Sequence, residues 1–199
     1  MFRITTRALA VLVLMTGLAG LNYGAIITLT GALSGANENP VVVSPGTGFA
    51  TVTFDTVTQM LGINVTFSGL TTNTVAAHIH CCILPPGNAI VATVMPAFPG
   101  FPLGVTSGSY SGTLDLTQAA SYNPAFITAN GGTVTSAETA LVNGLQNDLT
   151  YLNIHTTAFG GGEIRAFLTP VPEPSTLALA GIALTGAWVM RRRRSKLAR

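Results

Sequence analysis

The sequence predicts a mainly β protein, built as one antiparallel β-sandwich or barrel-like domain between two apolar terminal segments. Apolar and polar residues alternate with a period of two, as where Ile63, Val65 and Phe67 are separated by polar side chains. Twenty-two glycines and eleven prolines punctuate the chain, and many lie between these alternating runs, where turns are expected. Several short strands with regular turn signals are typical of an antiparallel sandwich or barrel.

The alternation extends over a middle domain that we place at residues 26–169, between a leader at 1–25 and a tail at 170–199. The strands are predicted near residues 26–33, 47–55, 59–68, 75–80, 89–95, 107–116, 149–156 and 162–168. One helix is predicted at Ser136–Asn147, with Ser136 as its N-cap.

The leader is typical of a secretory signal peptide. Arg3 and Arg7 precede an unbroken run of apolar and small residues from Ala8 to Leu21. This run is too short to span about 30 Å of hydrocarbon and lies where the apolar core of a signal peptide is expected. An N-terminal membrane anchor is the alternative interpretation.

The tail contains a second apolar segment, Leu177–Met190, followed by Arg191–Arg194. It predicts a short transmembrane helix, with the arginines remaining on the cytoplasmic side of the membrane. Pro172 and Pro174 keep the preceding chain extended. The alternative, a buried core helix, is disfavoured by four successive arginines.

Charge and motifs exclude several function classes for the middle domain. Arg165 is the only Lys or Arg between residues 25 and 170, against six acids, which gives a formal charge of −5. A nucleic-acid partner is therefore not expected. The chain also lacks a Gly-x-Ser-x-Gly elbow, a P-loop and a dinucleotide-binding glycine pattern. We therefore expect that the protein is not an enzyme.

The tail resembles a known sorting signal. Pro172-Glu173-Pro174, a short apolar stretch and an arginine cluster follow one another, as in a PEP-CTERM sorting tail. The resemblance implies export in a Gram-negative bacterium, transient insertion of 177–190 into the inner membrane, and processing by an exosortase. It further implies a location at the cell envelope, at the cell surface or in the extracellular matrix.

The three histidines of the chain lie in two short strings, AHIH (Ala77–His80) and NIHT (Asn153–Thr156). A period of two places His78 and His80 on one face of their strand. If 149–156 and 162–168 form a hairpin, His155 lies near Glu163 and Arg165. Packing the two strings side by side would gather three imidazoles, a carboxylate and a guanidinium.

These strings resemble the chordin-type domain, CHRD. The motifs that carry the resemblance are LSGANENP (Leu33–Pro40), Ser68-Gly69-Leu70, AHIH, NIHT and GGEIR (Gly161–Arg165), in this order. The resemblance covers roughly residues 27–168 and implies a mostly β module with a binding or structural role. Cys81-Cys82 departs from the family pattern, in which small residues commonly follow the histidines.

Two interpretations of the histidines remain open. In the first, His78, His80 and His155 bind Zn or Cu, with Glu163 as a fourth ligand and the cysteine thiolates as possible substitutes. In the second, which we favour, no cofactor is present and the imidazoles join a polar network with Asn153, Glu163 or backbone groups. Arg165 would pair with Glu163 in this network, and a guanidinium disfavours a metal ion beside it.

Cys81 and Cys82 are the only cysteines. In an oxidising compartment they are expected to form a vicinal disulfide, with intermolecular pairing and a metal-bound thiolate pair as alternatives. The function that fits these observations is an exported, non-enzymatic binding or structural module, in contact with extracellular polysaccharide or a surface protein. An extracellular metal-binding or metal-dependent protein that uses the three histidines is the alternative.

Overall fold

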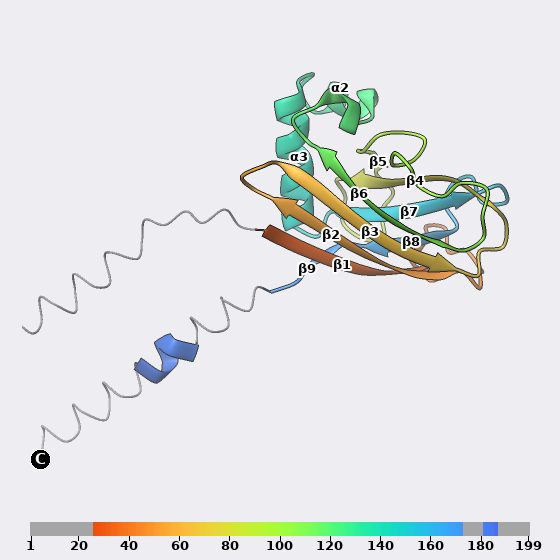
Figure 1. The fold of residues 1–199 in the computed structure, drawn as a ribbon, viewed down its shortest axis with the longest axis horizontal. Coiled ribbons are helices and arrows are strands. Elements are labelled where there is room, and N and C mark those ends of the chain that lie inside the picture. Colours follow the sequence, from red (N-terminus) through yellow and green to blue (C-terminus); the bar gives the residue numbers. More distant parts are fainter. Residues whose placement is uncertain (1–25, 173–180, 187–199) are drawn as a thin grey trace, which may run out of the picture.

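A computed structural model describes residues 26–172 and 181–186 of the 199-residue chain. Within this part the fold is one antiparallel sheet of nine strands, in the order β5-β4-β7-β8-β1-β2-β3-β6, with β9 added to β1 (Figure 1). The strands are β1 Ile26–Ser34, β2 Thr47–Asp55, β3 Met60–Ser68, β4 Thr74–Cys81, β5 Ile90–Val91, β6 Gly108–Asp115, β7 Thr150–Thr156, β8 Ile164–Phe167 and β9 Thr169–Pro170.

The alternating sequence sets the pairing of the central strands. Along β3 the residues are buried and exposed in turn, so that Ile63 lies opposite Val52 on the inner face. The turn between β2 and β3 is stabilised by Asp55, whose carboxylate accepts hydrogen bonds from the main-chain N–H groups of Val57 and Thr58.

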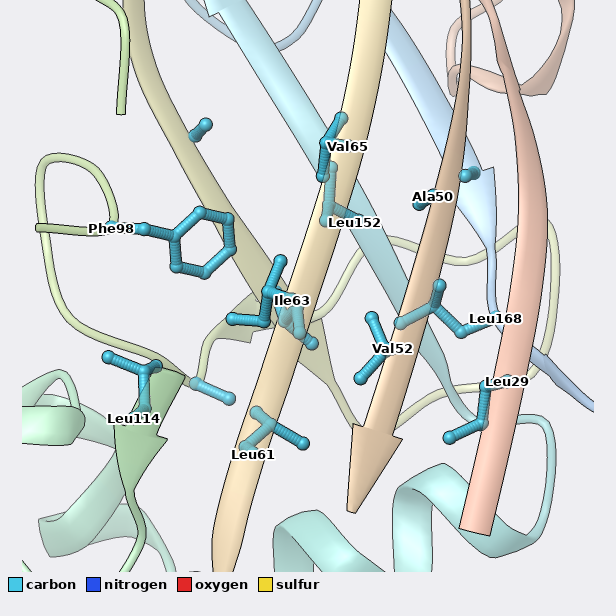
Figure 2. Packing of buried hydrophobic residues seen from close by; sticks show 14 of the residues in the cluster. Leu29, Ala50, Val52, Leu61, Ile63, Val65, Phe98, Leu114, Leu152 and Leu168 are labelled. Atoms are coloured by element: carbon cyan, nitrogen blue, oxygen red, sulfur yellow. The ribbon is translucent and has the colours of Figure 1, made fainter. Parts of the chain in front are cut away.

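The sheet curls into a half-barrel, so that β4 and β7 lie behind β2 and β3 in Figure 1. Side chains from both halves fill the inside, including Val52, Ile63 and Leu152, all of them fully buried (Figure 2). The predicted mainly β antiparallel fold is therefore confirmed. A sandwich of two separate sheets is not: β1 pairs with β2 along its length and also with β8, which joins the halves into one sheet.

Two helices, α2 (Pro124–Ala129) and α3 (Val134–Gln146), lie at one end of the sheet (Figure 1). The predicted helix thus exists but begins two residues earlier. Thr133, not Ser136, is the N-cap, and Ser136 is the third helical residue, whose hydroxyl accepts from the Thr133 N–H in a capping box.

The predicted strand at 89–95 shortens to the two residues of β5. Beyond it the chain bends, Thr93 makes an isolated bridge to Tyr122, and the prolines at 96, 99 and 102 occupy a loop that covers β4.

The terminal predictions fall largely outside the described residues. These are the signal peptide at 1–25, and the sorting helix at 177–190 apart from residues 181–186, which are helical. In the parts of the chain that the structure describes, no helix has the length and apolar character needed to cross a membrane.

Candidate functional site: a three-histidine cluster

The candidate site lies on the outer face of β4, β7 and β8, opposite the hydrophobic core. Ile79 and Leu152 point inward and are fully buried, so the residues that alternate with them point outward. His78 and His80 on β4 therefore share a face with the outward-pointing residues of β7, which are Tyr151, Asn153 and His155. Register places His80 opposite Tyr151 and His78 opposite Asn153.

The structure brings the three histidines together. One ring nitrogen from each of His78, His80 and His155 lies within 4.8 Å of the others. The centroid of the His78 ring lies 4.8 Å from that of His80 and 4.5 Å from that of His155. Ala76, opposite His155 on β4, contributes only a methyl group and leaves room for the imidazole. The spacing suits three ligands of one metal ion, as in sites built from several imidazoles.

Main-chain carbonyls determine the tautomers of two of these rings. His80 Nδ1 lies 2.8 Å from Ala89 O, and His155 Nδ1 lies 3.0 Å from Gly160 O. A carbonyl only accepts, so each Nδ1 carries the hydrogen and each neutral ring has its lone pair on Nε2. Both Nε2 atoms are buried without a hydrogen-bond partner, as is Nδ1 of His78.

Burial keeps the cluster neutral. Desolvation, assisted by the neighbouring imidazoles, lowers the pKa of His78 from 6.5 to about 3. Burial likewise lowers the pKa of His80 to about 4, against the opposing effect of its hydrogen bond to Ala89, and lowers the pKa of His155. Unprotonated imidazole is the form that binds metal ions.

Arg165 lies beside the cluster but not with its predicted partner. Its guanidinium forms a buried ion pair with Glu38, at 3.0 Å between Nη2 and Oε2, and its Nε also donates to Glu38. Further donations go to Gly87 O and Asn88 Oδ1. The predicted Arg165–Glu163 pair is therefore wrong, because Glu38 reaches the guanidinium from a loop distant in sequence.

Glu163 also lies outside the cluster, so its expected role as a fourth ligand does not match the structure. Its carboxylate accepts hydrogen bonds from the hydroxyls of Ser44 and Thr156 and from the N–H of Thr71, each at 2.6 Å. The ladder of β8 begins only at Ile164, and Gly162 has a φ of +125°, so strand alternation does not extend back to Glu163.

An aromatic stack links Arg165 to the histidines. Its guanidinium lies 4.1 Å from the ring centroid of Tyr151, and the Tyr151 ring stacks on His80 at 4.6 Å. Asn153 lies between His78 and Arg165 in the strand register. Its amide makes a long contact, 3.5 Å from Nδ2 to Gly161 O, and also interacts with the Glu38 carboxylate, while its Oδ1 is buried without a partner.

Cys81 and Cys82, which follow His80, are joined to each other by a disulfide bond in the structure. The sulfur of Cys81 points to the core side, away from the histidine face, and both sulfurs approach the carbonyl of Ala140 on α3. Neither cysteine belongs to the three-histidine group.

The order of motifs and the fold now agree with a family. A model of the CHRD domain matches residues 29–168, which is most of the chain. The chain belongs to the CHRD domain family. A PEP-CTERM protein-sorting motif matches residues 170–194, which include Pro172, Glu173 and Pro174, although Glu173 and Pro174 lie outside the described residues. No curated protein and no solved structure matches the chain.

The sorting motif implies an exported protein that is directed to the envelope of a Gram-negative bacterium and processed by an exosortase. The CHRD domain is then the exported part, and it carries the histidine cluster on its outer face.

Sequence reasoning missed Glu38 and Asn88, the partners of Arg165. The sequence contained a signal for this pair. Arg165 is the one Lys or Arg of the domain, so a buried guanidinium there needs a carboxylate as its partner, and the domain has only six acidic residues to choose from. Glu38 lies in LSGANENP, a motif that carried the family resemblance without a physical role.

Proposed function

We propose that this CHRD domain protein is a non-enzymatic module, displayed at the cell surface or in the extracellular matrix, that binds one transition-metal ion through His78, His80 and His155. Two observations carry the proposal: each of the three imidazoles brings a ring nitrogen within 4.8 Å of the others, and each also has a buried ring nitrogen without a hydrogen-bond partner. Buried polar atoms are normally satisfied, so unpartnered nitrogens in one cluster point to a ligand.

Closure of the site favours binding over catalysis. The exposed fractions of His78, His80 and His155 are 3%, 8% and 7%. A catalytic metal keeps an open coordination position for water or substrate, whereas a structural or storage site is closed. Loops at residues 35–40, 82–89 and 157–163 cover this face through contacts to Arg165, His80 and His155.

Metal stoichiometry tests the proposal. The full chain is stripped with a chelator, incubated with Zn(II) or with copper, dialysed and analysed for metal. About one ion per chain is expected, and less than a tenth as much in the His78→Gln/His155→Gln variant. Because the chain has three histidines in all, no other imidazole contributes. Circular dichroism checks the fold of the variant; substoichiometric metal, or metal unaffected by the substitutions, would contradict the proposal.

A second candidate function is contact with a neutral polysaccharide, favoured by the outer face of β1, β2, β3 and β6. Cross-strand registers align its side chains in rows, of which one is Thr30, Thr51, Asn64 and Ser111 and the next is Ala32, Phe49, Thr66 and Ser109. Neither row contains a charged group. Phe49 is 49% exposed beside a shallow hollow of about 300 Å³. Hydroxyls, an amide and one exposed ring match the chemistry of an uncharged sugar chain.

Retention on cellulose and on immobilised dextran tests this second function. Phe49→Ala is expected to lower the retention of the full chain at any salt concentration, whereas Val57→Ala, which shortens an exposed apolar side chain in the turn between β2 and β3, is expected to leave it unchanged. Equal retention of the Phe49→Ala variant and the original chain would refute the role of this face.

A further inference from the structure

Among the residues that the structure describes, no carboxylate accepts a hydrogen bond from a ring of the three-histidine cluster. The Nδ1 hydrogens of His80 and His155 go to the neutral carbonyls of Ala89 and Gly160, not to carboxylates. In many zinc sites a carboxylate accepts this hydrogen and offsets part of the charge of the dication. Here that compensation is missing for both rings.

The nearest formal charges do not replace it. The Arg165 guanidinium stacks on Tyr151, which stacks on His80, so a positive charge lies one ring away from a ligand. Glu38 is bound to Arg165 through Oε2, and its charge is offset by that ion pair, although its Oε1 is buried without a hydrogen-bond partner. Glu163 is outside the cluster and saturated by three hydrogen bonds.

Electrostatics then favours the binding of an ion of low charge at this site. The cost of moving an ion from water into a low-dielectric site grows with the square of its charge, and repulsion by Arg165 grows with the charge itself. A dication held by three neutral ligands keeps its full +2, whereas a monovalent ion carries only +1. Among the first-row metals that imidazole binds, copper is the one with a stable monovalent state.

We propose that the cluster of His78, His80 and His155 selects monovalent copper, Cu(I), over Zn(II). This inference rests on the metal-binding function proposed above and specifies its ligand. Three nitrogen donors complete the coordination of Cu(I) without a water molecule or an anion, which agrees with the closure of the site.

A substitution at Asn153 can change the charge beside the histidine cluster. This residue lies in register between His78 and Arg165, and its buried Oδ1 has no partner. Asn153→Asp replaces the amide by a carboxyl with almost no change of shape; burial beside Glu38 disfavours its ionised form, which a bound dication then favours more than a bound monocation does. The added charge stabilises a dication about twice as strongly as a monocation.

The experiment is an anaerobic competition on the full chain. Cu(I) is supplied as its complex with bathocuproine disulfonate, and Zn(II) is supplied at equal concentration with a chromogenic chelator as reporter. We expect one Cu(I) per chain, not displaced by Zn(II). Asn153→Asp shifts the ratio of Cu(I) to Zn(II) affinity toward zinc by about tenfold or more. Asn143→Asp, the same charge change at an exposed position on α3, leaves the ratio unchanged.

The outcomes separate the two proposals. Zn(II) that displaces Cu(I) from the original chain overturns the copper inference and leaves metal binding intact, whether or not Asn153→Asp folds. An equal shift by Asn143→Asp and Asn153→Asp refutes the local electrostatic reasoning. Failure to bind either ion removes the metal function itself.

Discussion

Gly144 on α3 offers a sharp test of how the helix rests on the cysteine pair. Alanine in place of a helix-interior glycine normally stabilises a protein by about 1 kcal/mol. At this position a new Cβ would collide with Cys81 Sγ and would lie 3.1 Å from Cys82 Sγ and 3.2 Å from Thr150 Cγ2. Overpacking of this kind costs about 1–3 kcal/mol.

With three neighbours in the way, we place the cost near the upper end of that range, so Gly144→Ala is expected to lower the free energy of unfolding by about 1–2 kcal/mol. The assay is urea unfolding of the purified, unreduced chain, followed by circular dichroism. Asn143→Ala, at an exposed position one residue earlier, is expected to stabilise the protein by about 0.3–0.6 kcal/mol.

A double-mutant cycle identifies the cause. In a Cys81→Ala/Cys82→Ala background the sulfurs are gone, so Gly144→Ala should lose most of its penalty, which corresponds to a coupling of about 1–2 kcal/mol. A stabilising effect of Gly144→Ala in the original chain, or the same penalty in both backgrounds, would refute this account of the helix packing.

Three further predictions concern the residues around the site. Burial raises the pKa of Glu163, but its hydrogen bonds outweigh burial and hold the pKa below 4.5; its stabilising effect is therefore present above pH 4.5 and is lost as the pH falls through the lower pKa. Glu163→Gln should flatten the acid side of a stability–pH curve measured by thermal unfolding, and an unchanged slope would contradict this. Gly162→Ala should destabilise the domain by about 1–3 kcal/mol in the same assay, because φ is +125° and a Cβ would collide with the amide of Asn153, whereas Gly160→Ala meets nothing and should be neutral. The intact mass of the unreduced, exported chain should be two hydrogens below that of the reduced chain, as expected for a Cys81–Cys82 bond; equal masses would exclude the bond.

The strands could be predicted from the sequence because their signal is local. Alternation with a period of two identifies β2 and β3 almost to the residue, and the same rule places His78 and His80 on one face. His155 joins this pair as soon as β7 lies beside β4. The order of the short sequence motifs made this pairing of strands a reasonable hypothesis.

The partners of Arg165 and Glu163 could not be predicted in this way. Glu38 is separated from Arg165 by 127 residues and reaches it through a loop, where no periodicity applies. Alternation assigned Glu163 to the face of Arg165, but the rule holds only inside a continuous ladder, and that ladder starts at Ile164. Loop geometry, set by Gly162 and its positive φ, decided the direction of the carboxylate.

Main-chain atoms, more than side chains, determine the chemistry of the site. The carbonyls of Ala89 and Gly160 set the tautomers of His80 and His155, so the path of two loops matters and the side chains of those loop residues do not. Arg165 holds one of these loops through Gly87 and Asn88, while its charge acts on the cluster through Tyr151. Lysine at this position would keep the charge but lose the planar fork that binds several acceptors at once. The path of this loop and the electrostatics of the site thus both depend on the same buried guanidinium.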